Sequence, residues 1–151
     1  MIRTMPANDP IQLRDRALVA FILLTGARDG AVKSLKLKHL DLSEECLIHD
    51  AREVTTKFGK SFATTFFPVG AEARRVVEEW VGFLTKEMHW APTDPLFPAT
   101  LVDGGAGNAF HAAGLRREHW TTADPIRKVS SAPSRRRGCP TTPRTDCGTR
   151  L

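Results

Sequence analysis

Arg28 is the residue of this sequence best placed to act on an anion. It follows Gly26 at the end of the most apolar stretch of the chain, and a lysine-rich stretch begins directly after it. Glycine commonly ends a helix in the left-handed conformation, so Gly26 predicts a corner with Arg28 at the start of a new helix. A guanidinium beside fresh helical N–H groups suits an oxyanion. The alternative is that Arg28 pairs with a nearby carboxylate, such as Asp15 or Asp29.

Several lysines offer further positive charge to a nucleic-acid backbone. One group follows Arg28 on the outward face of the expected second helix, and the other flanks a tight turn. They are Lys33, Lys36 and Lys38 in the first group and Lys57 and Lys60 in the second. Amines at such positions can contact successive phosphates. The alternative is that both groups form an ordinary solvated surface.

Metal or cofactor chemistry finds little support in the sequence. Cys46 and His49 form a single half-site without a second pair, and a strand histidine beside a cysteine is usually a packing residue. The glycines at 104, 105 and 107 precede no clear helix, so they do not form a phosphate-binding loop. We therefore expect no metal and no cofactor.

The helices that must position these residues can be placed from caps and periodicity. Asp9-Pro10 predicts the start of a helix that runs to about Thr25, and its apolar second half is typical of a central buried helix. A second helix is expected from about Asp29 to Leu37, and a fourth begins at Thr122 or Asp124. The third, from Ala71 to about Met88, has a core stripe of Ala73, Val77, Trp80 and Leu84.

Between the second and third helices the pattern changes to alternation. Strands are expected over 46–49, 53–56 and 61–67, with the turn at 57–60 joining the last two. Residues 90–107 carry turn residues throughout and are expected to form a loop, in which Pro95-Leu96-Phe97-Pro98 tucks in. The predicted fold class is α+β, mainly helical with a small three-stranded antiparallel sheet.

Length and charge set further bounds. The 151 residues permit one domain with a real core. No apolar run is long enough to span a bilayer, no signal peptide is recognisable, and three cysteines do not indicate a disulfide framework, so we expect a cytoplasmic protein without a membrane partner. Five of the 22 basic and one of the 17 acidic residues lie in 129–151, so residues 1–128 carry a net charge of only +1. Bulk charge alone therefore does not predict DNA binding.

The last part of the chain differs from the rest. Residues 129–151 contain no Leu, Ile, Phe, Trp or Met before Leu151, and Ser, Pro, Arg, Thr, Gly and Cys dominate. A packed helix cannot be built from that composition. We expect a folded unit over residues 1–128 and an irregular tail over 129–151, and our hypothesis is that the tail is read out of frame.

The order of these segments resembles the catalytic domain of the tyrosine recombinases, or phage integrases, from about Leu13 to Lys128. The resemblance is carried by Thr25-Gly26-Ala27-Arg28, by the helix and small sheet that follow, and by Asp94-Pro95-Leu96-Phe97-Pro98. It implies an incomplete recombinase catalytic fold, and the family cuts and rejoins DNA without a metal through a covalent tyrosine–phosphate intermediate. The partners it implies are double-stranded DNA and, in an assembled complex, other recombinase protomers.

The resemblance also implies roles for single residues. Arg28 corresponds to the first of two arginines that hold the phosphate, and Lys57 to the lysine that protonates the leaving 5′ oxygen, with Lys60 as the competing candidate. Lys33, Lys36, Lys38 and Lys60 are the expected DNA contacts.

The sequence departs from the family where catalysis is concerned. The family usually places an acid three residues after its first arginine, and Ala31 stands there. No His-x-x-Arg follows Lys128, and the chain contains no tyrosine. Without the nucleophile it should not cleave DNA. We therefore expect an inactive DNA-binding fragment of a recombinase. The alternatives are a non-catalytic DNA-binding module, a helix-turn-helix regulator over 26–42, or a remnant without selected function.

Overall fold

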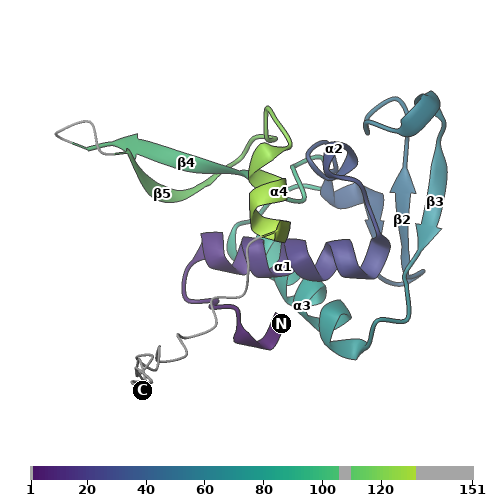
Figure 1. Ribbon diagram of the computed structural model, residues 1–151, viewed down its shortest axis with the longest axis horizontal. Helices are drawn as coiled ribbons and strands as arrows, with labels where there is room; N and C mark the ends of the chain where they lie inside the picture. Colours follow the sequence, from purple (N-terminus) through teal and green to yellow (C-terminus); the bar gives the residue numbers. More distant parts are fainter. Residues whose placement is uncertain (1, 106–109, 132–151) are drawn as a thin grey trace, which may run out of the picture.

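Helix α1 (Pro10–Thr25) lies at the centre of the structure, a computed structural model that describes residues 2–105 and 110–131 (Figure 1). Asp9 caps it, because its Oδ1 accepts a hydrogen bond from the Gln12 N–H at 2.9 Å. Gly26 ends it in the left-handed conformation, with φ 62° and ψ 20°. Leu18 and Phe21 are fully buried. The predicted bounds and the central burial of this helix are confirmed.

Two further helices pack against α1. Helix α3 (Ala71–Gly82) runs against it and continues as a π-helical turn, η4 (Phe83–Glu87), while α4 (Asp124–Ser131) crosses it (Figure 1). The predicted stripe on α3 is confirmed, and its Trp80 Nε1–H donates to the Leu96 carbonyl at 2.9 Å. The segment at 95–98 is buried as expected. A short 3-10 turn, η1 (Ile2–Thr4), precedes α1.

A three-stranded antiparallel sheet lies at the C-terminal end of α1 (Figure 1). Its order is β1 (Leu40–Asp41), β2 (Cys46–His49) and β3 (Phe62–Thr65). The sheet and the overall α+β class are as predicted. The strand expected at 53–56 is wrong, because that segment turns: the Asp50 carbonyl accepts the N–H groups of Glu53 and Val54 at 3.0 and 2.7 Å.

The misassigned strand has a physical explanation. Val54 is 2% exposed and Thr55 is exposed, which imitates the alternation of a half-buried strand. The turn at 57–60 consequently does not join two strands. It contains a 3-10 turn, η3 (Lys57–Gly59), with Phe58 at φ 64°.

Helix α2 (Asp29–Val32) is four residues long, much shorter than the predicted 29–37. The chain leaves the helix because it bonds to the segment at 94–98: the Leu35 carbonyl accepts the Leu96 N–H at 3.0 Å, and the Leu37 N–H donates to the Asp94 carbonyl at 3.0 Å. A second 3-10 turn, η2 (Leu37–His39), follows.

A two-stranded antiparallel ribbon replaces part of the expected loop at 90–107. Strands β4 (Ala99–Gly104) and β5 (Phe110–Arg116) form it, and it projects at the other end of α1 from the sheet (Figure 1). The loop prediction was wrong here because the glycines after Val102 mark the end of a strand rather than a longer irregular segment.

The predicted boundary at 128/129 falls inside α4, which runs on to Ser131, with Val129 packed against the core. The rest of the predicted tail, 132–151, lies outside the described residues. Over the described ranges, no helix has both the length and the apolar character needed to cross a membrane.

Candidate functional site

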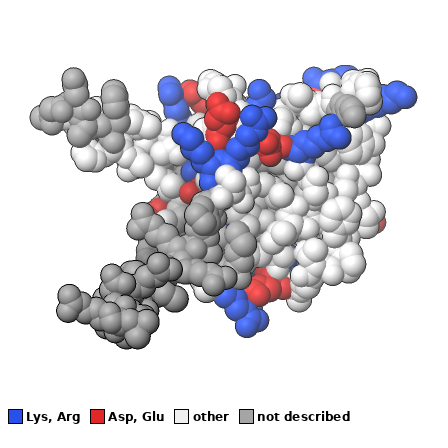
Figure 2. Space-filling model, in the orientation of Figure 1, with Lys and Arg blue, Asp and Glu red and all other residues white. Residues whose placement is uncertain are grey.

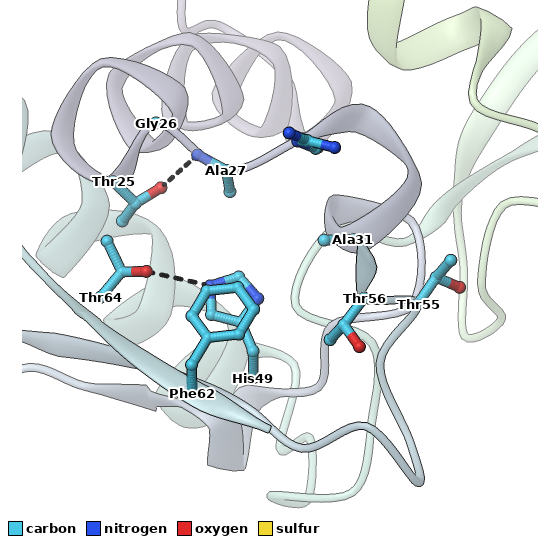
Figure 3. A pocket seen from close by; sticks show the side chains of 10 residues that line it. Thr25, Gly26, Ala27, Ala31, His49, Thr55, Thr56, Phe62 and Thr64 are labelled. Atoms are coloured by element: carbon cyan, nitrogen blue, oxygen red, sulfur yellow. Dashed lines mark hydrogen bonds between the residues drawn. The ribbon is translucent and has the colours of Figure 1, made fainter. Parts of the chain in front are cut away.

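A pocket of about 230 Å³ lies at the corner between α1 and α2, facing the three-stranded sheet (Figure 3). Three parts of the chain contribute its walls: the corner itself, the turn after β2, and the paired strands β2 and β3. Its lining consists of Thr25, Gly26, Ala27, Arg28, Ala31, His49, Thr55, Thr56, Phe62 and Thr64. We call it the Arg28 pocket.

The corner that carries Arg28 is held from two sides. The Thr25 hydroxyl donates to the Phe21 carbonyl at 2.8 Å and accepts the Ala27 N–H at 3.3 Å (Figure 3). The Phe67 N–H donates to the Leu24 carbonyl at 2.7 Å. The Phe67 ring packs against Gly26, so that a Cβ added to Gly26 would stand 2.8 Å from Cε2 of that ring. The backbone next to Arg28 is therefore fixed by the end of α1 and by the chain leaving β3.

The Arg28 side chain is exposed and lines the pocket. Within residues 2–105 and 110–131 its guanidinium has no ion pair or hydrogen bond. The two carboxylates considered as partners are both engaged elsewhere, since Asp15 pairs with Arg14 at 2.7 Å and Asp29 with Arg127 at 2.8 Å. The internal pairing of Arg28 that we considered from the sequence is thus not found.

The short α2 changes one part of the expectation. A helix of four residues has almost no internal hydrogen bonds and only a weak dipole. The helical N–H groups that were expected to help Arg28 hold an anion therefore contribute little. What remains at the corner is the guanidinium, with the polar side chains of the pocket around it.

The turn that leads to Lys57 is anchored beside α2. Ser34 Oγ accepts the Thr55 N–H at 3.0 Å. Glu53, two residues earlier, receives a group of donors that we call the Glu53 cluster, with distances of 3.4, 2.7 and 3.0 Å from the side chains of Lys36, Lys38 and His39.

The protonation of the cluster follows from its contacts. The Lys36 N–H donates to His39 Nδ1 at 2.9 Å, so His39 carries its proton on Nε2, which faces Glu53. The Lys38 ammonium is the main group that lowers the pKa of Glu53, to about 2. The segment at 53–56 is thereby fixed by charge as well as by the Ser34 contact.

The expected DNA-binding lysines are distributed unequally. Lys36 and Lys38 bind Glu53 and do not line the Arg28 pocket. Lys33 is half-buried, and Lys60 is exposed after η3. Lys57 follows Thr56 of the pocket directly, and its side chain lies outside what the structure describes.

His49 is a pocket residue that the sequence did not single out as a ligand of a phosphate. Its imidazole is 4% exposed and stacks on Phe62, with ring centroids 4.2 Å apart and 14° between the planes. Its Nε2 lies 3.4 Å from Thr64 Oγ1 (Figure 3). Burial lowers the pKa of His49, and the nearby His39 lowers it further. Cys46, its partner in the half-site considered above, stands three residues away and so on the opposite face of β2.

Charge elsewhere on the surface is mixed. On the face in Figure 2, Lys and Arg atoms lie beside Asp and Glu atoms along one edge, and much of the rest is uncharged. Ion pairs of exposed arginines include Arg127 with Asp29 at 2.8 Å and Arg117 with Asp94 at 2.5 Å. Local sites, rather than an overall basic surface, must therefore carry any recognition of nucleic acid.

The sequence matches no protein-family model, and no curated protein matches it either. A function for this chain must consequently be inferred from the chemistry of the Arg28 pocket.

Proposed function

We propose that this chain is the DNA-binding fragment of a tyrosine recombinase catalytic domain, and that it holds a backbone phosphate at Arg28 without cleaving it. The observation that carries the proposal is the Arg28 guanidinium, which has no protein partner in the described residues and lines a pocket rich in hydroxyl groups. A guanidinium offers a planar fork of donors that matches the oxygens of a phosphate.

The size of the pocket is compatible with a phosphate group. At about 230 Å³ it is smaller than the roughly 300–1,000 Å³ typical of pockets for drug-sized ligands. Such a volume suits one phosphate group and part of its sugar. Contacts to phosphate position a protein on DNA without reading its sequence, so we expect binding that is independent of sequence.

Cleavage is not part of the proposal. The family's reaction needs a tyrosine to form the covalent intermediate, and the chain has none. A suicide DNA substrate, which traps any covalent protein–DNA adduct, should therefore yield no adduct with this chain. An adduct would contradict the proposed inactivity.

The affinity for a duplex, measured across a salt series, tests the binding directly. The logarithm of the association constant should fall linearly with the logarithm of salt concentration, and Arg28→Ala should reduce that slope by about 0.9, the share of one phosphate contact. Lys86→Ala is the matched control, since Lys86 is an exposed cation on η4 that does not line the pocket. Equal slopes for Arg28→Ala and the unchanged chain would contradict the proposal.

The helix-turn-helix alternative receives less support. A recognition helix must be long enough to lie in the major groove, and α2 has four residues. A non-catalytic module that contacts only phosphates predicts the same salt slopes, and it differs from the recombinase proposal in ancestry rather than in chemistry.

A further inference from the structure

Two residues that line the Arg28 pocket each carry an unsatisfied buried polar atom. Over the described residues, buried side-chain atoms without a hydrogen-bond partner include His49 Nδ1 and Thr56 Oγ1. Both residues line the pocket that also contains Arg28. Figure 3 shows Ala27 above His49, with Ala31 and Thr56 close together to the right of it. Buried polar groups are nearly always paired in folded proteins, so two such atoms in one small pocket indicate a missing ligand.

One tautomer of His49 makes the unsatisfied Nδ1 a donor. Thr64 Oγ1 lies 3.4 Å from Nε2, and when that hydroxyl donates, the imidazole proton resides on Nδ1. Nδ1 is then a donor without an acceptor. The Thr56 hydroxyl can donate as well, and Arg28 only donates. Three donors around one cavity call for a ligand made of acceptors.

We propose that His49 and Thr56 are phosphate ligands that act together with Arg28: His49 Nδ1–H and Thr56 Oγ–H donate to oxygens of the same tetrahedral anion. This inference rests on the proposed function and extends it from one residue to a three-part site. The ligand class is a phosphate oxyanion, which the backbone of DNA or free inorganic phosphate could supply.

The surroundings of His49 fit this role. The ring is held on one side by Phe62, whose own side chain is 49% exposed, and at its edge by Thr64. Its position is therefore set before a ligand arrives, and binding needs only a local opening of the pocket that exposes the buried Nδ1. The backbone next to Thr56 is held as well, because Ser34 Oγ accepts the N–H of the preceding residue.

The imidazole nitrogen resonances of the full chain report on His49 directly. Titration with inorganic phosphate should shift the Nδ1 resonance of His49 in a saturable way, and the resonance is assigned by its absence in His49→Asn. The same titration of Arg28→Ala should leave it unchanged. A His49 resonance that does not respond to phosphate would overturn the inference.

Thr56 provides a variant that does not disturb the core, since it is only half-buried. Thr56→Val removes the hydroxyl at nearly equal volume and should weaken both phosphate and duplex binding at least about threefold, or roughly 0.65 kcal/mol. Thr56→Ser keeps the hydroxyl and should bind like the unchanged chain. Equal affinities for the two variants would overturn the role of Thr56.

The outcomes separate this inference from the proposed function. If Arg28→Ala loses duplex binding while Thr56→Val and the His49 resonance are unaffected, the inference fails and the proposed function stands. If Arg28→Ala binds the duplex as well as the unchanged chain does, the proposed function fails. If inorganic phosphate shifts His49 and a duplex does not, the site binds a small phosphate, which supports the three ligands and overturns DNA as their source.

Discussion

The Arg28 pocket and the Glu53 cluster are neighbouring polar regions with opposite states of satisfaction. In the cluster, Lys36, Lys38 and His39 reach one carboxylate at distances of 2.7 to 3.4 Å. In the pocket, Arg28 has no partner among the described residues, and His49 Nδ1 and Thr56 Oγ1 are buried without one. Among the described residues, the charged groups of the Glu53 cluster are therefore paired with one another, whereas these three polar groups of the Arg28 pocket have no partner.

The difference shows why basic residues cannot be counted as equal. From the sequence, the lysines after Arg28 and the arginine itself were all predicted to contact DNA. A cation that is already paired in the protein must lose that pair to bind a phosphate, whereas an unpaired one loses only water. We therefore propose a structural role for the cluster and a role in recognition for the pocket.

The largest loss of duplex affinity should come from removing the charge of Arg28. We expect Arg28→Ala to lower duplex affinity at least about tenfold, or roughly 1.4 kcal/mol, because a charge-assisted contact to phosphate is lost. Lys36→Ala should lower it less, because Lys36 already binds Glu53. Fluorescence anisotropy at one fixed, low salt concentration compares the two. Equal losses would remove the distinction between the two regions.

The corner that holds Arg28 should be sensitive to a methyl group. Gly26→Ala places a Cβ at φ 62° and 2.8 Å from the Phe67 ring, so we expect a loss of unfolding free energy of about 1–2 kcal/mol from the backbone alone. Urea denaturation measures it.

Gly82→Ala is the matched control for that substitution. Gly82 is helical, and a Cβ there would meet no atom within 4 Å, so alanine should stabilise the chain by about 0.5–1 kcal/mol. Opposite signs for the two glycines are the expected result, and a neutral Gly26→Ala would refute the account of the corner.

Removing the acceptor of the cluster should affect stability and leave recognition intact. Glu53→Gln leaves Lys38 and His39 facing a neutral amide, and we expect a lower thermal midpoint with a smaller loss than that of Gly26→Ala. Duplex affinity should not fall, because freed lysines only add positive charge. Glu87→Gln on η4 is the control for removing one negative charge. A Glu53→Gln variant that loses DNA binding would place the cluster in the recognition site.

The smallest effect on stability is expected from a change of pH. Burial is the main cause that lowers the pKa values of His39 and His49 from 6.5, so the unfolded chain binds protons more readily than the folded one. The stability they contribute is complete above pH 6.5 and declines as the pH falls below it. Glu53, with a pKa of about 2 in place of 4.5, adds a second decline between those values. Urea midpoints between pH 5 and 8 test the first window, and a midpoint that rises below pH 6.5 would contradict it.

Local signals in the sequence were sufficient for α1 and the corner. Asp9 and Gly26 act within one turn of the ends of α1, so their residue types alone place those ends. Val54 led to the wrong prediction of a strand at 53–56, because its burial comes from a turn packed on the core. The end of α2 was missed for a similar reason, since Leu35 and Leu37 bond to residues about 60 positions later in the chain.

Only part of the pocket could be predicted from the sequence. Arg28 could be predicted because the glycine cap and the arginine are neighbours in the chain. The significance of His49 depends on Phe62 and Thr64, which are brought to it by strand pairing, and on the absence of a partner for Nδ1. That absence is a property of the folded chain, and no residue pattern along the sequence reports it.

Backbone amide spectra recorded during titration with a short DNA duplex give the most direct test of where the anion binds. We predict saturable shifts at the corner from Gly26 to Asp29, at His49 and at Thr55 and Thr56, with little change from Lys36 to His39. Shifts confined to Lys36–His39 and Glu53, with the corner silent, would show that DNA is held by the paired lysines and not by Arg28.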